Sequence, residues 1–421
     1  MKKILITHFY TRENGGDAGI LQGAVQELAT AFPGSALTVH TMEQVSDGLP
    51  VPPVVFMKSY FYWAVYAPFL NVFTRAIRTA YILCYTTLVA ALVAIFGNRA
   101  LWLLPGKLRR VMYDYAHADL ILPIGGGYLT AKNSVQGTIT TLLQLHAICI
   151  ALILQKPVVL LAQSVGPYAT SFQKFLVRIV LNRVNAIFVR ENFSNDFLKS
   201  IGVIKPHIAL ATDSAFLCSF PTPAPATQPA RAVVAITARR WYAPAAQQQY
   251  EHVLADFADW LVNDVDCDVH LVPQVIATTQ NDNDSAVLTR VLQYSKNAMT
   301  GRVVLLPNPA GLSELWGWYG GFHAVVGTRM HSVIFALTHY VPCIAIGYEY
   351  KTKGIMDALG LDPFVVPIDN CTLQNLQQLY RKIEAERAQY EQTLRANLPQ
   401  YIDSAKKPFQ YLKTHYGTAH Q

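Results

Sequence analysis

The chain has 421 residues, of which 52% are hydrophobic and only 14% are charged, and its formal net charge is +7. This composition excludes a disordered protein, and the length suits two domains better than one. The six cysteines form no C-x-x-C pair and no zinc-type spacing with histidine, so we expect neither a disulfide framework nor a metal site. The apolar run at residues 4–6 is too short for a signal-peptide core, and the sequence therefore predicts a cytoplasmic protein.

Short apolar runs alternate with longer amphipathic stretches, which is typical of parallel sheets covered by helices. In the first half, strands are expected at 3–7, 36–40, 120–124, 158–162, 186–189 and 208–211, and helices at 17–31, 139–155, 172–182 and 191–201.

The segment 51–113 interrupts this pattern and has an unusual composition. It contains seven Lys and Arg residues and no Asp or Glu, so it accounts for the whole net charge. The neutral remainder argues against nucleic-acid binding, which calls for a basic stripe on a folded domain. Two uncharged runs lie inside it, the aromatic-rich 59–74 and the 20-residue run 79–98.

The run 79–98 is long enough to cross a bilayer. A single span would place the strands before and after it on opposite sides, although we expect them in one sheet. A hairpin of two spans, an element lying in the membrane interface and a buried helical hairpin all satisfy this constraint. The flanking cations and aromatic residues favour contact with an anionic membrane surface through 51–113. We therefore expect a peripheral protein on the inner face of the cytoplasmic membrane.

The proline-rich stretch 219–231 is predicted to be a linker. After it, the alternation of strands and helices starts again. The predicted domains are an N-terminal α/β domain (1–218), a C-terminal α/β domain (232–371) and a helical extension (372–421). The predicted fold class is α/β, with two Rossmann-like parallel-sheet domains facing a cleft. Strands of the second domain are expected at 233–237, 269–273, 303–306, 324–326 and 343–346.

Ligands of such sheets bind beyond the carboxyl ends of the strands, so the turns there are candidate sites. The first is Asn14-Gly15-Gly16-Asp17, whose glycines permit a backbone to approach a ligand closely, although Asp17 reads equally well as a plain helix N-cap. Another is the turn Gly125-Gly126-Gly127, whose N–H groups can cradle an anion. It matches neither a dinucleotide fingerprint nor a P-loop.

Three polar residues follow other strands of the first domain: Ser164, Arg190 and Asp213. Arg190 suits a planar anion, but it can equally pair with Glu191 or with a helix carbonyl. Ser164 can belong to a bare turn, and Asp213 can be a cap.

In the second domain, Arg239 and Arg240 follow the first strand, and Lys351 and Lys353 follow the last. One of the two arginines is expected to face a bound anion and the other to face solvent. The lysines either add positive charge to the same site or belong to a solvated loop.

The most specific turn is Arg329-Met330-His331, which leads into an apolar helix. A cation at a helix start opposes the positive end of the helix dipole, so Arg329 is expected to hold an anion there. His331 can reach the same place and exchange a proton near neutral pH. The alternative is a histidine that is satisfied by packing near the core.

Taken together, these turns resemble the polysaccharide pyruvyltransferase family, with matching motifs in order from about residue 4 to 360. They are Asn14-Gly15-Gly16-Asp17, Gly125-Gly126-Gly127, Gln163-Ser164-Val165-Gly166-Pro167, Val189-Arg190-Glu191 with Ser194, Asp213, Arg239 and Arg240, Arg329-Met330-His331, and Tyr348 with Lys351 and Gly354. The segment 51–113 and the C-terminal helix depart from the common pattern, as does the extra glycine before Asp17.

The resemblance implies a fold similar to B-type glycosyltransferases, phosphoenolpyruvate as the donor and a sugar, lipid-linked or free, as the acceptor. The product would be a pyruvate ketal, formed without a metal or a redox cofactor. It also implies catalytic roles for Arg329 and His331, with Arg190 in donor binding. Two alternatives stay open, a nucleotide-sugar-dependent glycosyltransferase of the same fold type and a non-catalytic assembly protein of the cell envelope.

Overall fold

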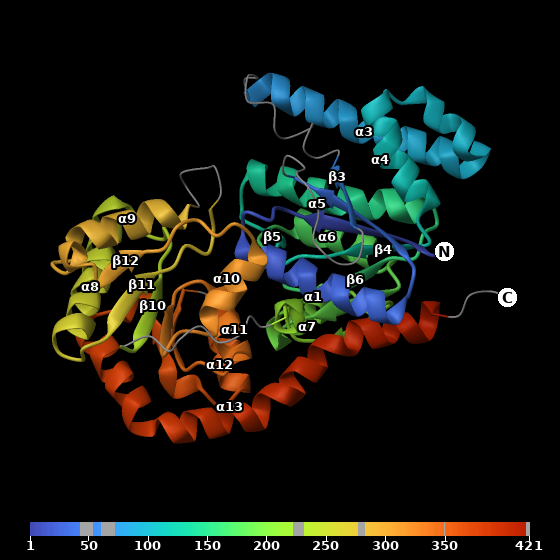
Figure 1. Ribbon diagram of the computed structural model, residues 1–421. Coiled ribbons are helices and arrows are strands. Elements are labelled where there is room, and N and C mark those ends of the chain that lie inside the picture. Colours follow the sequence, from blue (N-terminus) through green and yellow to red (C-terminus); the bar gives the residue numbers. More distant parts are fainter. Residues whose placement is uncertain (43–53, 60–71, 222–230, 277–282, 349, 418–421) are drawn as a thin grey trace. The chain divides into compact units, whose positions relative to one another are not determined.

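The computed structural model describes residues 1–42, 54–59, 72–221, 231–276, 283–348 and 350–417 (Figure 1). Most of the predicted linker (222–230) and most of the aromatic run (60–71) lie outside the described residues.

The chain divides into two compact units. The first contains Met1–Thr11, Ile20–Leu217 and Ser404–Gln421, and the second contains Arg12–Gly19 and Cys218–Asp403. This division differs from the expected one because 12–19 belongs to the second unit and 404–421 to the first. Helices α1 (Gly15–Ala31) and α13 (Leu373–Tyr416) therefore each continue from one unit into the other.

The first unit is built on parallel strands in two main sheets, with the orders β3-β2-β1-β4 and β6-β8-β9. A parallel bridge between Ile121 and Val158 links the two sheets. Strands such as β4 and β6 are buried along their whole length, as expected where helices cover both faces of a parallel sheet. The strands are β1 (Lys3–Phe9), β2 (Ala36–Thr41), β3 (Val54–Lys58), β4 (Leu120–Pro123), β6 (Val159–Gln163), β8 (Ala186–Val189) and β9 (His207–Leu210), and a separate pair is β5 (Leu129–Ala131) with β7 (Val165–Tyr168).

Every strand and helix that the sequence predicted in this unit is present within a few residues of its expected bounds. The expected boundary of the apolar segment is wrong at its start, because β3 lies inside 51–113 and pairs with β2. The helices are α3 (Val72–Phe96), α4 (Gly106–His117), α5 (Val135–Ile153), α6 (Ser171–Leu181) and α7 (Asn192–Ser200), with 3-10 turns η1 (Gly97–Leu103) and η2 (Ser214–Leu217).

The second unit contains one parallel sheet of six strands in the order β12-β11-β10-β13-β14-β15. The chain first moves outward from β10 to β12 and then returns to the other side of β10, so the winding direction switches between β10 and β13. The strands are β10 (Val233–Thr237), β11 (Asp268–Leu271), β12 (Val303–Leu305), β13 (Ala324–Gly327), β14 (Cys343–Gly347) and β15 (Val365–Pro367).

Helix α11 is buried along Val333–Leu337 because its sequence is apolar on all sides, and such a helix is stable only inside a core. The helices of this unit are α8 (Pro244–Asn263), α9 (Asp284–Tyr294), α10 (Leu312–Tyr319), α11 (Met330–Thr338) and α12 (Tyr350–Ala358), with 3-10 turns η4 (Ala298–Thr300), η5 (Asp362–Phe364) and η6 (Ile368–Asn370).

Two histidines, the half-buried His8 and the buried His146, make the first unit sensitive to acid. His8 contacts the carbonyl of Gln144 through Nε2 at 2.8 Å, and His146 contacts the carbonyl of Leu83 through Nε2 at 3.1 Å. Burial lowers the pKa of each imidazole to about 4. Each histidine is therefore neutral in the folded protein at pH values where the unfolded chain already binds a proton.

Lowering the pH from 7 to 5 is expected to destabilise the protein by about 2 kcal/mol for each of these histidines. The sign follows because the unfolded state binds more protons than the folded state between the folded pKa near 4 and the unfolded pKa of about 6.5. Urea denaturation of the full chain across this pH range measures the effect. His146→Gln keeps a donor for the Leu83 carbonyl and should reduce the pH dependence; an unchanged dependence would contradict the assignment.

Candidate functional site

The candidate site of the second unit lies at the switch in its sheet. Ligands of open α/β sheets bind beyond the carboxyl ends of the strands at such a point. Arg239 and Trp241 follow β10, and Arg329 and His331 follow the adjacent strand β13. Arg329 is the N-cap residue of α11, as the sequence predicted from its place at a helix start.

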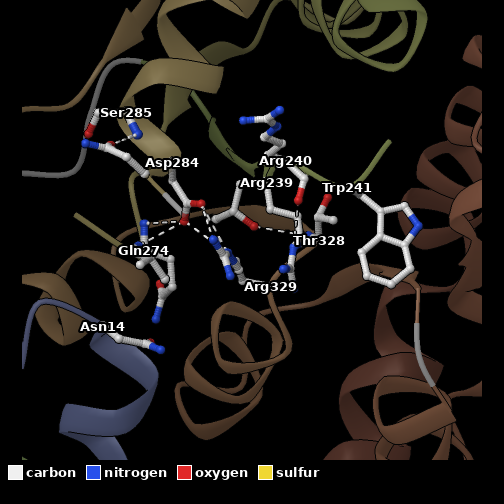
Figure 2. Close-up of polar contacts among 12 residues, drawn as sticks. Asn14, Arg239, Arg240, Trp241, Gln274, Asp284, Ser285, Thr328 and Arg329 are labelled. Carbon is white, nitrogen blue, oxygen red and sulfur yellow. Dashed lines mark hydrogen bonds and ion pairs between the residues drawn. The ribbon is translucent and has the colours of Figure 1, made fainter. Parts of the chain in front are cut away.

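The guanidinium of Arg329 forms an ion pair with the carboxylate of Asp284 (Figure 2). Nη2 donates at 2.6 Å and Nε at 3.1 Å to the same carboxylate oxygen. Only 8% of Arg329 is exposed, and Asp284 is fully buried. The sequence predicted that Arg329 holds an anion at this helix start, and in the structure the guanidinium is paired with a protein carboxylate.

Asp284 also fixes the backbone beyond β11. Its Oδ2 accepts hydrogen bonds from the N–H groups of Val275, at 2.9 Å, and Gln274, at 3.3 Å. The carbonyl of Gln274 in turn accepts from the N–H of Gly15 at 2.9 Å. One carboxylate thus connects the turn after β13, the segment after β11 and the first residues of α1.

The two glycines of the first turn permit close packing. A Cβ at Gly16 would overlap the imidazole of His331, and a Cβ at Gly15 would overlap the side chain of Leu315. His331 remains partly exposed although it packs against the backbone at Gly16. The glycine pair therefore brings the start of α1 into direct contact with the predicted acid–base residue.

Asn14, rather than Asp17, caps helix α1. Its side-chain oxygen accepts from the N–H of Gly16 at 2.9 Å, and its carbonyl accepts from Ala18 at 2.9 Å. The interpretation of Asp17 as an N-cap is wrong because Asp17 lies within the first helical turn. An acidic side chain there still stabilises the positive end of the helix dipole.

Buried hydroxyl groups hold the end of β13 in place. Thr237 accepts from the N–H of Thr328 at 3.1 Å and contacts Ser332 at 2.9 Å. Ser332 donates to the carbonyl of Arg329 at 2.6 Å, and Tyr250 contacts Thr328 at 2.7 Å. These bonds fix the backbone from which Arg329 and His331 project.

An aromatic pair spans the end of β13. Trp241 follows β10, Tyr348 follows β14, and their rings lie 4.7 Å apart. The guanidinium carbon of Arg239 lies 4.4 Å from the Tyr348 ring centre and 5.5 Å from that of Trp241. Trp241 is 41% exposed, which leaves a large part of its indole open to solvent.

The remaining predicted cations of this unit lie at different places. Arg240 is exposed and lines a groove of about 570 Å³ with Tyr242, Arg290 and Tyr294. Lys351 is half-buried in the first turn of α12, with its ammonium 5.9 Å from the Tyr350 ring centre, and Lys353 is exposed two residues further on. The structure thus separates Arg239, which contacts aromatic rings, from Arg240, which faces the groove.

The predicted residues of the first unit form a second cluster. Arg190 forms an ion pair with Asp213, and its Nε and Nη2 donate to the hydroxyl of Ser164 at 3.1 and 2.7 Å. Ser164 donates to Glu191 at 3.0 Å, and Glu191 also accepts from Ser194. Arg190 therefore pairs with Asp213 rather than with Glu191.

The triple-glycine turn adjoins this cluster. Gly126 accepts from the N–H of Ser164 at 3.1 Å, and a Cβ at Gly126 would lie 3.8 Å from the Arg190 guanidinium. Gly125 has a φ of +145°, a conformation that favours glycine. Gly127 is half-buried beside it. Four predicted residues, Gly126, Ser164, Arg190 and Asp213, are thus brought together in one unit.

In the part of the chain that the structure describes, no group of three or more His, Cys, Asp or Glu side chains is arranged to hold a metal ion.

Comparison with protein families gives a match to the polysaccharide pyruvyl transferase model over residues 14–350. The chain belongs to this family. The match begins at the Asn14 turn and ends after Tyr348, so it contains both clusters described above.

The amylovoran biosynthesis protein AmsJ of Erwinia amylovora is 28% identical over 272 residues, which is 58% of this chain and 65% of that protein. The chain therefore matches slightly less than two thirds of the length of this relative.

Solved structures establish the fold type. A putative UDP-N-acetylglucosamine 2-epimerase from Listeria monocytogenes aligns with a TM-score of 0.61 at 12% identity, over 99% of this chain and 97% of that one. Anabaena HepE in complex with UDP-glucose aligns with a TM-score of 0.56 at 14% identity, over all of both chains. The fold is thus α/β with two parallel-sheet units of the B-type glycosyltransferase kind.

Sequence reasoning did not identify Asp284, Gln274 or Trp241 as members of the site. Asp284 follows Asn283, which caps α9, so the local pattern signals only a helix start. Its partner Arg329 is 45 residues away in the sequence, and no local pattern links the two. Trp241 and Tyr348 were visible as aromatics after strands, but their contact depends on the order of strands in the sheet.

Replacing Asp284 with Asn is expected to destabilise the protein by about 3 kcal/mol, because Arg329 would keep a buried charge without its counter-charge. Thermal and urea unfolding of the full chain measure this loss. Asp256→Asn is a matched control on the exposed side of α8 and should change the stability little. Equal stability of both variants would contradict a structural role for the Arg329–Asp284 pair.

Proposed function

We propose that this protein transfers a pyruvyl group from phosphoenolpyruvate to a sugar of a cell-surface polysaccharide or of its lipid-linked precursor, forming a ketal. One observation carries the proposal beyond family membership. A partly exposed histidine, His331, lies at the switch in the sheet. Its ring packs against the backbone at the start of α1, because Gly16 has no side chain to block it. That is the place where an α/β sheet offers a ligand site, and histidine is the side chain that most often acts as a general acid or base.

The proposed reaction has two steps. A proton is added to the methylene carbon of phosphoenolpyruvate, which becomes the methyl group of the product, while a sugar hydroxyl loses its proton and bonds to the adjacent carbon. A second hydroxyl then bonds to the same carbon, loses its proton and displaces inorganic phosphate. His331 is our candidate for the proton transfers, because a histidine side chain can both donate and accept a proton in general acid–base catalysis. No metal or redox cofactor takes part in this scheme.

In this proposal Arg329 serves as a positioning residue for His331, and its charge is not free to bind the donor alone. Its pairing with Asp284 fixes the residue that precedes His331 by two positions. Positive charge for the donor carboxylate and phosphate is proposed to come from Arg239, with Arg240, Lys351 and Lys353, which lie at other places, as further candidates. Arginine binds such planar anions with two parallel hydrogen bonds.

In the first unit, Arg190, Ser164 and Asp213 are proposed to hold the turn at Gly126 and Gly127 in a shape that presents backbone N–H groups to a substrate anion. Asp17 is proposed to contact substrate from the first turn of α1. The protein is proposed to be peripheral on the cytoplasmic face of the inner membrane and to bind its acceptor there.

The exposed indole of Trp241 is proposed to stack on the acceptor sugar. The Trp241–Tyr348 pair spans the end of β13, from which His331 follows after four residues. An aromatic ring offers a flat apolar face without a large entropy cost, which suits a sugar ring. The platform is thus adjacent in the sheet to the residue that we assign to proton transfer.

Replacing His331 with Gln is expected to reduce kcat by about 10²- to 10⁴-fold, because an amide cannot exchange the proton. Phosphate release from phosphoenolpyruvate, measured across a panel of saccharide acceptors, tests this. Binding of phosphoenolpyruvate, followed by calorimetry, should persist in the variant. Full residual turnover would remove His331 from the mechanism.

The same assay separates the pyruvyl transferase from a nucleotide-sugar glycosyltransferase. Release of a nucleotide from a nucleotide sugar, with no phosphate from phosphoenolpyruvate, would favour the glycosyltransferase.

Replacing Trp241 with Ala is expected to raise the KM for the acceptor by about fivefold, because stacking of this kind contributes about 1 kcal/mol. The KM for phosphoenolpyruvate should change little. Phe172→Ala removes an exposed aromatic side chain from α6 and serves as the control. A change in kcat alone, with the acceptor KM intact, would contradict the stacking role.

A further inference from the structure

Helix α3 turns apolar side chains toward solvent. Its exposed residues include a stripe at helical spacing, Ile77, Tyr81, Leu88 and Ile95, and the last of these is 71% exposed. The opposite side of the helix contains buried residues such as Ile82, Val89 and Val93, and α3 packs on α5. A surface helix of a soluble protein normally exposes its polar face to solvent, whereas the solvent-facing side of α3 is apolar.

The segment after α3 extends this apolar face. Trp102 is 74% exposed in η1, and Leu103 beside it is 55% exposed. The guanidinium of Arg109, in the first turn of α4, lies 4.2 Å from the ring centre of Trp102. Tryptophan next to arginine is typical of side chains at the level of lipid headgroups.

The charges around this face have one sign. Arg78 is exposed in the first half of α3, and Arg99, Lys107 and Arg110 are exposed after its end. The sequence 51–113 contains no acidic residue to balance them. A second copy of this chain docked on the same face would bring these cations together without counter-charges. An anionic lipid surface supplies both the apolar layer and the negative charge.

The sheet of the first unit excludes a single membrane span by α3, although α3 is long and apolar enough to form one. Strand β3 before the helix pairs with β2, and β4 after it pairs with β1, all in one sheet. Both ends of α3 must therefore lie on the same side of a bilayer. A helix that lies in the interface satisfies this constraint.

We propose that the outward face of α3 and η1 docks this protein on an anionic lipid leaflet, with the helix lying in the plane of the interface. The face, defined by Ile77, Tyr81, Leu88, Ile95, Phe96, Trp102 and Leu103, buries its apolar side chains among the acyl chains near the headgroups. The surrounding cations contact lipid phosphates. This inference specifies the location assigned under the proposed function, and it does not depend on the pyruvyl transfer reaction.

Co-sedimentation of the purified full chain with vesicles tests the proposal. The protein is expected to pellet with vesicles of phosphatidylcholine and phosphatidylglycerol, and to remain largely in solution with phosphatidylcholine alone. Replacing Arg99, Lys107 and Arg110 together with Gln should lower the partition coefficient for anionic vesicles on the order of a hundredfold, since each cation near such a surface contributes about a factor of five. High salt should weaken binding of the wild-type protein.

The double variant Leu88→Glu with Ile95→Glu is expected to lose vesicle binding. Both side chains are more than half exposed, so thermal unfolding should change little and reports whether the variant is folded. Ile204→Glu places the same charge at an exposed apolar residue before β9 and should bind vesicles like the wild type. Phosphate release with a water-soluble acceptor should be equal in all three proteins, which separates a failure of docking from a failure of the proposed reaction.

Three results would overturn the inference. One is wild-type protein that stays in solution with anionic vesicles. Another is binding that the double variant retains. The last is a dimer in solution that the double variant dissociates, which would assign the apolar face to a second copy.

Discussion

The buried ion pair between Arg329 and Asp284 is the interaction on which the site of the second unit depends. Burying two charges costs free energy unless each is paired and hydrogen-bonded, and here the carboxylate is also bonded to two backbone N–H groups. The pair therefore fixes the turn after β13 relative to the segment after β11. Through the Gln274 carbonyl it also fixes the glycine turn at the start of α1, against which His331 packs.

The strands and helices could be predicted from the sequence because each has a local pattern of apolar residues. Runs such as Val233–Thr237 and Ala186–Val189 are apolar and short, and both lie at the predicted positions. The assignment of 12–19 to the second unit was beyond such reasoning, since it rests on contacts with distant residues, such as the hydrogen bond from Gly15 to a residue 259 positions further along the chain. The return of α13 to the first unit is likewise a long-range packing effect.

The sites were predicted in part, and for a physical reason. The carboxyl ends of parallel strands meet at one edge, so polar residues after strands were expected to gather there, and Ser164, Arg190 and Asp213 do so. What the sequence could not supply is which charges neutralise each other. Arg190 and Arg329 looked like anion ligands from their positions, yet each forms an ion pair with an aspartate inside its own unit.

The consequence is that two of the arginines named from motifs, Arg190 and Arg329, are each committed to a carboxylate of the protein. A guanidinium bonded to a buried carboxylate contributes little net charge to an incoming anion, but it holds its backbone in one conformation. His331 is partly exposed and Trp241 is 41% exposed, and the proposed function assigns the substrate contacts to these two side chains. In this family member, therefore, arginine–aspartate pairs build the rigid frame, and the chemistry is assigned to the side chains that the frame leaves accessible.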